Sequence, residues 1–199
     1  MLAVQGARQP SITTLDPVTA RSATKEGLAL LDGALHPGVE VKELRVPGPG
    51  GPMDARLYLP AGTQGPLPGL VFFHFGGCVI GDLDTCHVFC SMIAGQAGIA
   101  VLNVAYRLAP EHKFPAQVED AVAAYRWANG NAEDLRMIPG RIGVGGDSAG
   151  GYLSAVVAQA AKREGFAAPA LQLLIYPVTD WGWKGGSMES CADVYPLTR

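Results

Sequence analysis

The residues that point most directly to chemistry surround Ser148, in the sequence Gly-Asp-Ser-Ala-Gly at 146–150. An apolar, strand-like stretch precedes this motif, and an alanine- and valine-rich helical stretch follows it. A nucleophile elbow requires this context, because the serine must stand on a sharp turn between strand and helix, with its hydroxyl at the sheet edge. The pattern predicts attack by Ser148 on a carbonyl carbon. A structural turn is the alternative in a chain with 26 glycines.

A second motif, His74-Phe75-Gly76-Gly77, follows another apolar stretch. This is the place of the oxyanion loop in enzymes with a nucleophile elbow. Acyl transfer develops negative charge on the carbonyl oxygen, and backbone N–H groups aimed at that oxygen lower the barrier. The predicted donors are the N–H groups of Gly76, Gly77 and Ala149, which follows the nucleophile. His74 is either a base or a support of the glycine loop through a ring hydrogen bond, and the supporting role is favoured.

Two carboxylates near these motifs have competing interpretations. Asp147, beside the serine, is expected to form local hydrogen bonds that stiffen the elbow. Asp180 follows the last apolar stretch and is a candidate for the acid of a catalytic triad, but a loop-capping role is favoured. All four histidines precede Ser148, whereas chemistry of this type takes its general base from a later position. The sequence therefore predicts a nucleophile and an oxyanion hole without their usual base.

The predicted elements bring these residues to one edge of a sheet. From residue 70 onward strands alternate with helices, and the strands are apolar, which is typical of a mostly parallel sheet with helices on both faces. The predicted strands are 70–73, 99–105, 141–145 and a buried strand at 171–176, and the predicted helices are 84–97, 116–129 and 149–163. Asp84 is the candidate cap of the first of these helices. Ser148 then follows the fifth of six strands, counted from an upstream hairpin.

That hairpin is predicted from residues 39–46 and 53–59, which alternate apolar and polar side chains around a Pro/Gly turn. Before it, Asp16 and Pro17 are typical of a helix start, and the helix is expected to run to about Leu31.

Composition narrows the class of protein. The chain has 199 residues, 48% of them hydrophobic, and a net charge of −3, which fits one domain. Because it lacks a Lys/Arg cluster, we expect no nucleic-acid partner. Its apolar runs are far shorter than the roughly 20 residues of a membrane span. The four cysteines, Cys78, Cys86, Cys90 and Cys191, form no CxxC pair and no zinc spacing with histidine. We therefore expect no metal and no cofactor, and a reduced, cytoplasmic protein without a secretory signal.

Taken together, the motifs resemble those of the bacterial hormone-sensitive-lipase-like esterases, which have the α/β-hydrolase fold. The resemblance rests on the sequences HFGG at 74–77, GDLDT at 81–85, YRLAPEHKFPAQVED at 106–120, GGDSAGG at 145–151 and LLIYPVTD at 173–180. Phe75 stands where that family usually has glycine, so the wall of the acyl pocket is expected to differ while the hole survives. The resemblance implies a carboxylic ester hydrolase for small esters with short or medium acyl chains, with Ser148 forming an acyl-enzyme.

The resemblance also implies a domain organisation. Residues 1–38 are expected to form an N-terminal cap segment over the active site, in preference to a helix that only packs on the sheet edge. Residues 39–199 are expected to form an incomplete α/β-hydrolase core. In that family a later strand and loop carry the triad acid, and a still later one carries the histidine. We therefore expect a C-terminally truncated core whose last strands are missing.

Three functional hypotheses remain open. In the first, the chain is part of an esterase whose remaining part comes from a second chain or from another copy in a homo-oligomer. In the second, it is a non-catalytic protein that binds a small ligand on the same scaffold. In the third, it is a catalytically incomplete fragment that persists through assembly. An apolar edge strand at 171–176 favours assembly, because such an edge pairs or aggregates unless it is covered.

Overall fold

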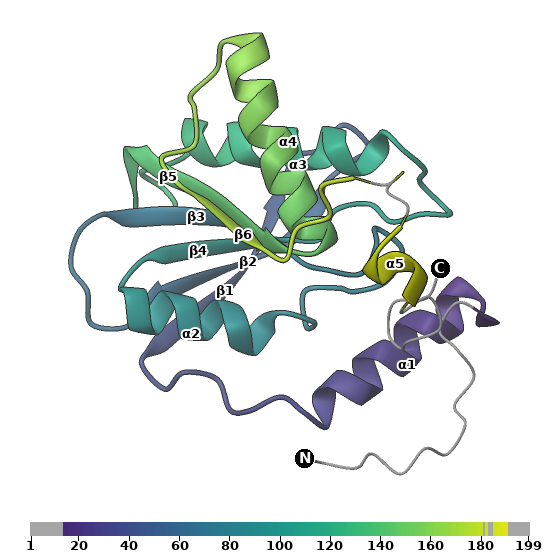
Figure 1. Cartoon of the computed structure of the whole chain (residues 1–199). Helices are drawn as coiled ribbons and strands as arrows, with labels where there is room; N and C mark the ends of the chain where they lie inside the picture. Colours follow the sequence, from purple (N-terminus) through teal and green to yellow (C-terminus); the bar gives the residue numbers. More distant parts are fainter. Residues whose placement is uncertain (1–13, 181, 183–184, 191–199) are drawn as a thin grey trace.

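The computed structural model describes residues 14–180, 182 and 185–190, and one six-stranded sheet lies at its centre (Figure 1). The strand order is β1-β2-β4-β3-β5-β6. In chain order the strands are β1 (Val39–Val46), β2 (Met53–Pro60), β3 (Leu67–Phe73), β4 (Ala100–Val104), β5 (Met137–Asp147) and β6 (Gln172–Ile175).

The strand directions are mixed in the way the sequence predicts. β1 pairs with β2 as an antiparallel hairpin, with Val39 opposite Pro60 and Val46 opposite Met53. β2 is also antiparallel to β4, whereas β3, β4, β5 and β6 are mutually parallel. The carboxyl ends of the parallel strands therefore meet at one edge of the sheet, where open α/β sheets bind their ligands.

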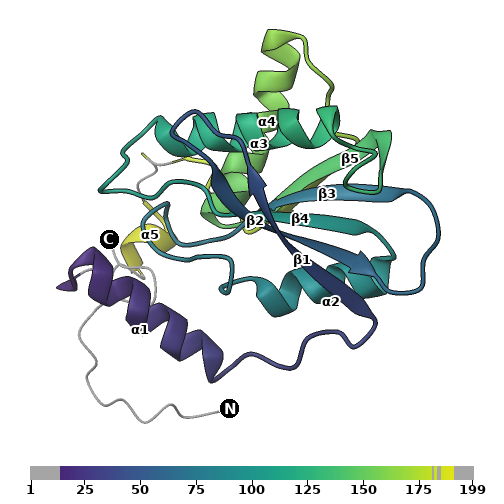
Figure 2. The ribbon, with the colours of Figure 1, turned by 180° about the vertical axis from the view of Figure 1, so that it is seen from behind.

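Helices cover both faces of this sheet, as Figures 1 and 2 show from opposite sides. α2 (His87–Ala97) lies on one face, and α3 (Ala116–Gly130) and α4 (Ala149–Glu164) lie together on the other. α1 (Pro17–Ala29) lies away from the strands, and α5 (Ser187–Ser190) is a single short turn. The predicted α/β architecture is confirmed, and no helix in the described ranges has the length and apolarity to cross a membrane.

Two helix starts test the capping predictions. The carboxylate of Asp16 accepts hydrogen bonds from the backbone N–H groups of Val18 and Thr19, at 3.0 Å each, so the predicted cap of α1 is confirmed. The predicted cap of α2 at Asp84 is wrong, because α2 begins later, at His87. Tertiary contacts outcompete local capping here, since the Asp84 carboxylate is engaged by two cations from elsewhere in the chain.

Successive side chains of β3 point to opposite faces of the sheet, and the core accordingly forms two layers. Val71 and Phe73 are fully buried on the face that α3 and α4 cover, and Leu70 and Phe72 are fully buried on the α2 face. A strand that is apolar at every position must lie between two covered faces, because successive side chains point to opposite sides. Cys86 and Cys90 pack as free thiols in the α2 layer, and Cys191 lies outside the described residues.

β6 is the apolar edge strand that the sequence analysis expects of an incomplete core, but it is not buried as its apolar run alone predicts. It lies at the edge of the described sheet, and Leu171, Leu174 and Tyr176 are 59%, 38% and 70% exposed. The apolar run predicts a strand correctly, but burial depends on neighbours that the run itself does not specify. β6 is also shorter than predicted, whereas β5 is longer and spans Met137–Asp147.

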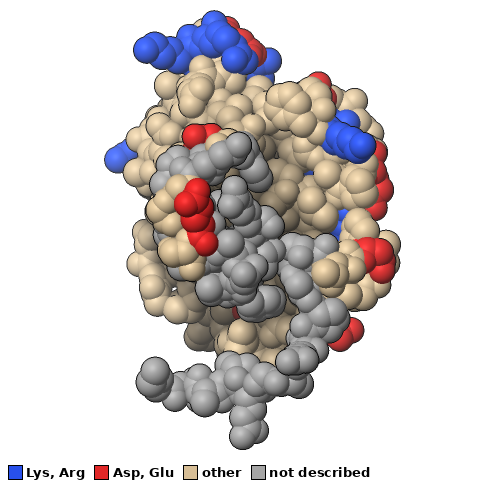
Figure 3. All heavy atoms as spheres, turned by 45° about the vertical axis from the view of Figure 1, so that its right-hand side comes forward, with Lys and Arg blue, Asp and Glu red and all other residues tan. Residues whose placement is uncertain are grey.

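The face in Figure 3 carries charges of both signs, and its largest group of basic side chains lies at the top, level with the far end of α4. The last turn of α4 carries Lys162 and Arg163. Cations at a helix carboxyl end interact favourably with the helix dipole. This group is remote from the sheet edge where the predicted site residues lie.

Candidate active site

Ser148 occupies a strained turn between β5 and α4. Its backbone angles are φ 51° and ψ −113°, in a region that non-glycine residues rarely adopt. Hydrogen bonds hold the turn, because the Ser148 N–H donates to the Ile175 carbonyl at 2.9 Å and the Tyr152 N–H donates to the Ser148 carbonyl at 3.0 Å. Residues in such conformations persist only where their surroundings fix them, and they cluster at active sites. The Ser148 side chain is half-buried at the edge of the sheet.

The glycines of the motif permit close contact between strand and helix. A Cβ atom at Gly150 would lie 1.8 Å from the carbonyl oxygen of Phe73 at the end of β3. A Cβ atom at Gly146 would lie 2.4 Å from the backbone of Gly150. Because neither residue has a side chain, the first turn of α4 touches the end of β3. This contact places Ser148 beside the loop that follows β3.

That loop presents unpaired backbone donors. Gly76 and Gly77 have φ values of 119° and 60°, and the carbonyl of Gly76 accepts hydrogen bonds from Val79 and Ile80 in a tight turn. Within the described ranges, no hydrogen bond engages the N–H groups of Gly76, Gly77 or Ala149. Unpaired N–H groups beside a helix start favour a negatively charged oxygen. The loop is therefore chemically suited to stabilise an oxyanion near Ser148.

His74 is buried beneath this loop. Its Nδ1 lies 2.7 Å from the carbonyl oxygen of Phe75, which places a ring N–H donor there, and its ring stacks on Tyr106 with centroids 4.4 Å apart. The Tyr106 hydroxyl donates to the His74 carbonyl at 2.7 Å. Burial lowers the pKa of His74 to about 4, so the ring is neutral at pH 7. These contacts are those of a residue that holds the glycine loop.

Replacing His74 with asparagine should flatten the dependence of stability on pH. The folded-state pKa, about 4, lies below the ordinary value of 6.5, so the unfolded chain binds more protons between these values. The stabilising effect of neutral His74 is complete above pH 6.5 and is lost as the pH falls through 4. From pH 7.5 to 5, wild type should lose about 2 kcal/mol in free energy of unfolding through this residue.

Urea denaturation at both pH values measures this effect as the difference between wild type and His74→Asn. The comparison is needed because burial raises the pKa of Asp147, whose contribution has the opposite sign. Equal slopes in wild type and His74→Asn would contradict the expected role of burial.

The two carboxylates singled out in the sequence lie in different surroundings. Asp147 is buried and accepts hydrogen bonds from the Tyr176 hydroxyl at 3.1 Å and the Cys86 thiol at 3.8 Å. Asp180 is exposed, and its Oδ1 accepts the N–H of Gly182 at 2.7 Å, which closes a local turn. Asp147 thus connects the elbow to its neighbours, while Asp180 makes the contact of a loop cap.

None of the four histidines, all of which are described, forms a hydrogen bond with Ser148. His87 shares a 2.7 Å hydrogen bond with the Tyr58 hydroxyl, and Nδ1 of His36 accepts the N–H of Gly38 at 3.2 Å. His112 lies in an exposed loop. The described residues also contain no cluster of three His, Cys, Asp or Glu side chains that could hold a metal ion.

A cavity of about 450 Å³ is bounded partly by residues that follow the glycine loop and the elbow in the chain. Its walls are mainly apolar, and they are formed by Cys78, Ala109, Lys113, Phe114, Gln117, Val118 and Tyr152. Cys78 follows the glycine loop directly, and Tyr152 lies one helical turn after Ser148. Phe75, expected from its sequence position to alter the pocket wall, packs instead against the α2 layer. The volume and lining suit a small apolar group.

Residues on α1 also reach the site, and the sequence analysis missed them. Nε of Arg21 donates to the carbonyl oxygen of Val79 at 2.8 Å, although the two residues are 58 positions apart. Lys25, one helical turn later, forms ion pairs with Asp82 and Asp84. The four-residue spacing of Arg21 and Lys25 indicates only weakly that they share one face of the helix. It does not reveal what that face contacts.

The family described as the alpha/beta hydrolase fold matches residues 70–199. Among curated relatives, the carboxylic ester hydrolase LipN of Mycobacterium tuberculosis is 49% identical over 166 residues, which cover 81% of this chain and 44% of LipN. The esterase LipI of the same organism is 40% identical over 192 residues, covering 92% of this chain and 60% of LipI. This chain thus spans about half of the length of these relatives.

Solved structures agree with the fold. The ester hydrolase EH1AB1 from the metagenome of Lake Arreo, in complex with a derivative of bipyridine phosphonate, superposes with a TM-score of 0.91 at 38% identity. The match covers 96% of this chain and 61% of that one. An esterase from Pyrobaculum calidifontis superposes with a TM-score of 0.86 at 37% identity, covering 94% of this chain and 62% of that one.

Proposed function

This chain belongs to the α/β-hydrolase fold family, as its resemblance to the hormone-sensitive-lipase-like esterases implied, and we propose that it serves in carboxylic ester hydrolysis. The observation that carries the proposal is the strained Ser148 elbow beside the unpaired N–H groups of Gly76, Gly77 and Ala149. The names of the relatives support the same chemistry.

The proposed reaction proceeds through an acyl-enzyme. The Ser148 hydroxyl attacks the ester carbonyl as its proton passes to a base, and the N–H groups of Gly76, Gly77 and Ala149 stabilise the negative charge on the carbonyl oxygen. Collapse of the tetrahedral intermediate releases the alcohol and leaves an acyl group on Ser148. Water then attacks this acyl-serine and releases the carboxylic acid, while the serine regains its proton. None of these steps requires a cofactor.

We propose that the general base is a histidine supplied from elsewhere: by a second chain, by a further segment of the protein, or by another copy of this chain. The support is geometric, because each described histidine is engaged or placed elsewhere and none forms a hydrogen bond with Ser148. Asp180 as the triad acid remains a weaker proposal, since its carboxylate caps its own loop. A non-catalytic binder of small ligands is the second candidate function, favoured by the same lack of a contacting base.

For domain organisation we propose that residues 1–38 form a cap segment and residues 39–199 the core. The support comes from α1, whose Arg21 contacts the loop that carries Gly76 and Gly77. Residues 1–13 lie outside the described part. A cytoplasmic location stays a prediction from the cysteine content of the sequence.

The cavity lined by Val118 and Tyr152 is proposed to accept a short or medium acyl group of a small ester. If so, Val118→Phe, which fills part of the cavity, should lower the hexanoate-to-acetate ratio of kcat/KM by about tenfold or more, because the larger side chain excludes methylene groups from the pocket. Ser148-dependent hydrolysis of the two p-nitrophenyl esters gives this ratio. Val118→Ala is the matched control and should preserve or raise it. An unchanged ratio in Val118→Phe would place the acyl group elsewhere.

The experiment that tests the function is a series of p-nitrophenyl esters, from acetate to decanoate, with release of both the alcohol and the acid measured. After a first equivalent of alcohol that accompanies acylation of Ser148, ester hydrolysis predicts equal amounts of the two products, with the highest rate at short or medium chains. Tight binding of a small carboxylic acid by calorimetry, with no turnover of any ester, would instead support the ligand-binding alternative.

A further inference from the structure

One face of α1 reaches the oxyanion loop through two cations that are four residues apart. Arg21 makes the first contact, with its Nε donating to the Val79 carbonyl oxygen at 2.8 Å. The same guanidinium donates to the Ala109 carbonyl at 2.9 Å and forms a two-pronged ion pair with Glu111, at 2.8 and 2.7 Å. A planar guanidinium suits several acceptors at fixed angles, which an ammonium does not. Arg21 thus joins α1 to the loops after β3 and β4 at once.

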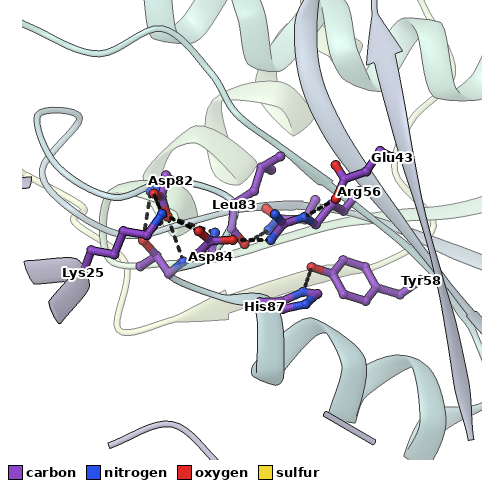
Figure 4. A network of polar contacts seen from close by, with 10 residues as sticks. Lys25, Glu43, Arg56, Tyr58, Asp82, Leu83, Asp84 and His87 are labelled. Carbon is purple, nitrogen blue, oxygen red and sulfur yellow. Dashed lines mark hydrogen bonds and ion pairs between the residues drawn. The ribbon is translucent and has the colours of Figure 1, made fainter. Parts of the chain in front are cut away.

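Lys25 makes the second contact, at the other end of the same loop (Figure 4). Its ammonium pairs with Asp82 at 3.2 Å and with Asp84. Asp84 also pairs with Arg56 on β2 at 2.6 Å, and Arg56 pairs with Glu43 on β1 at 2.7 Å. Lys25 is therefore linked through Asp84 to the strands of the sheet.

The predicted oxyanion donors, Gly76 and Gly77, lie just before the first of these two contacts in the chain. The N–H of Val79 donates to the Gly76 carbonyl at 2.9 Å, so the peptide held by Arg21 lies in the same turn as Gly76. At the far end, a Cβ atom at Gly81 would lie 2.5 Å from the His74 ring, which shows how tightly the turn packs on the histidine. The turn at Gly76 therefore cannot shift without moving the Val79 peptide that Arg21 contacts.

The two contacts differ in strength. The side chain of Arg21 is 26% exposed and donates to two backbone carbonyls as well as to Glu111, which is 49% exposed, whereas Lys25 is 55% exposed and pairs only with Asp82 and Asp84, which are 45% and 42% exposed. Exposed pairs are weakened by dissolved salt, while charge-assisted bidentate pairs are stronger. The guanidinium contact should therefore dominate, and the Lys25 contact should add a smaller, salt-sensitive part.

We propose that α1 fixes the oxyanion loop through these contacts and that Arg21 is a positioning residue for the proposed ester hydrolysis. Among the described residues, Arg21 donates to Val79, Ala109 and Glu111 and forms no hydrogen bond with Ser148. It acts by holding the Val79 peptide, and through it the N–H groups of Gly76 and Gly77. This inference rests on the proposed function, but its structural part does not require turnover.

The test compares the full chain with Arg21→Ala, Arg21→Lys and Glu111→Gln in two measurements. In hydrogen exchange, the amides of Val79 and Ile80 should exchange at least tenfold faster in Arg21→Ala. In p-nitrophenyl butyrate hydrolysis, kcat should fall at least tenfold while KM changes less than twofold, because a displaced oxyanion donor weakens the transition state more than the bound ester. Arg21→Lys should resemble Arg21→Ala in both exchange and kcat, because an ammonium cannot hold the same set of acceptors. Glu111→Gln keeps the arginine intact and should change both quantities by an intermediate amount.

Arg163→Ala is the matched control, since Arg163 is exposed at the far end of α4 and its ion pair is with the adjacent Glu164. It should leave exchange and kcat unchanged. Faster exchange in Arg21→Ala, without Ser148-dependent turnover in any variant even when imidazole is added as the base, would retain the structural role and overturn the proposed function. Unchanged exchange and kcat in Arg21→Ala and Glu111→Gln, in a chain that turns over esters, would overturn the role of Arg21 alone.

Discussion

Added imidazole should raise the Ser148-dependent hydrolysis of p-nitrophenyl butyrate by this chain on the order of 10²-fold. The elbow holds the nucleophile, and the loop after β3 offers unpaired N–H groups, but no described histidine forms a hydrogen bond with Ser148. A small diffusible base would supply the missing proton acceptor. The measurement is the initial rate as a function of imidazole concentration.

Ser148→Ala is the essential control, because imidazole itself cleaves activated esters. The variant should show only the rate of imidazole in buffer, since it has lost the group that forms the acyl-enzyme. An equal rise in wild type and Ser148→Ala would contradict nucleophilic catalysis by Ser148. A high Ser148-dependent rate without imidazole would instead mean that a base reaches the serine from another copy, or that His74 is misassigned.

Gly150→Ala should be the most destabilising single substitution at the elbow, with a loss of at least about 3 kcal/mol in free energy of unfolding. The new methyl group would lie 1.8 Å from the carbonyl oxygen of Phe73, so α4 or β3 must move. Backbone at both positions is buried in the sheet and its covering helix, which leaves little room for relaxation. Thermal unfolding should show a midpoint about 6–12 °C lower.

Gly130→Ala provides the matched comparison in a neighbouring helix. Gly130 is the last residue of α3, and a Cβ atom there meets nothing within 4 Å. Its replacement should be neutral or slightly stabilising, because alanine loses less backbone entropy than glycine in a helix. If Gly150→Ala unfolded at the same temperature as Gly130→Ala, the close contact between α4 and β3 would be wrong.

The sequence predicts those parts of the fold that depend on residue types and spacing within a short stretch of the chain. The apolar run before Ser148 and the glycines around it identify β5, the elbow and α4, because only a narrow range of structures allows a serine between a strand and a helix. The hairpin of β1 and β2 follows from two-residue alternation around a Pro/Gly turn. The Asp16 cap follows from side-chain chemistry within three residues.

The parts that the sequence did not predict depend on distant partners. Asp84 has the composition of a helix cap, but Lys25 and Arg56 engage its carboxylate from other elements. β6 has the composition of a buried strand, but its exposure depends on its place at the sheet edge. The contact of Arg21 with Val79 spans 58 residues and leaves no periodic signal. In each case tertiary context overrides a correct local tendency.

The central claim is that Ser148 carries the acyl group, and mass spectrometry of the protein after reaction with p-nitrophenyl butyrate tests it most directly. p-Nitrophenolate leaves readily, whereas water must be activated by a base to remove the acyl group, so the butyryl-serine should accumulate in this chain. After acid quenching and proteolysis, the account predicts a butyryl group on the peptide that contains Ser148, and none on that peptide from Ser148→Ala. A butyryl group found only on Cys78 or Lys113, or no modification while the ester is consumed, would contradict it.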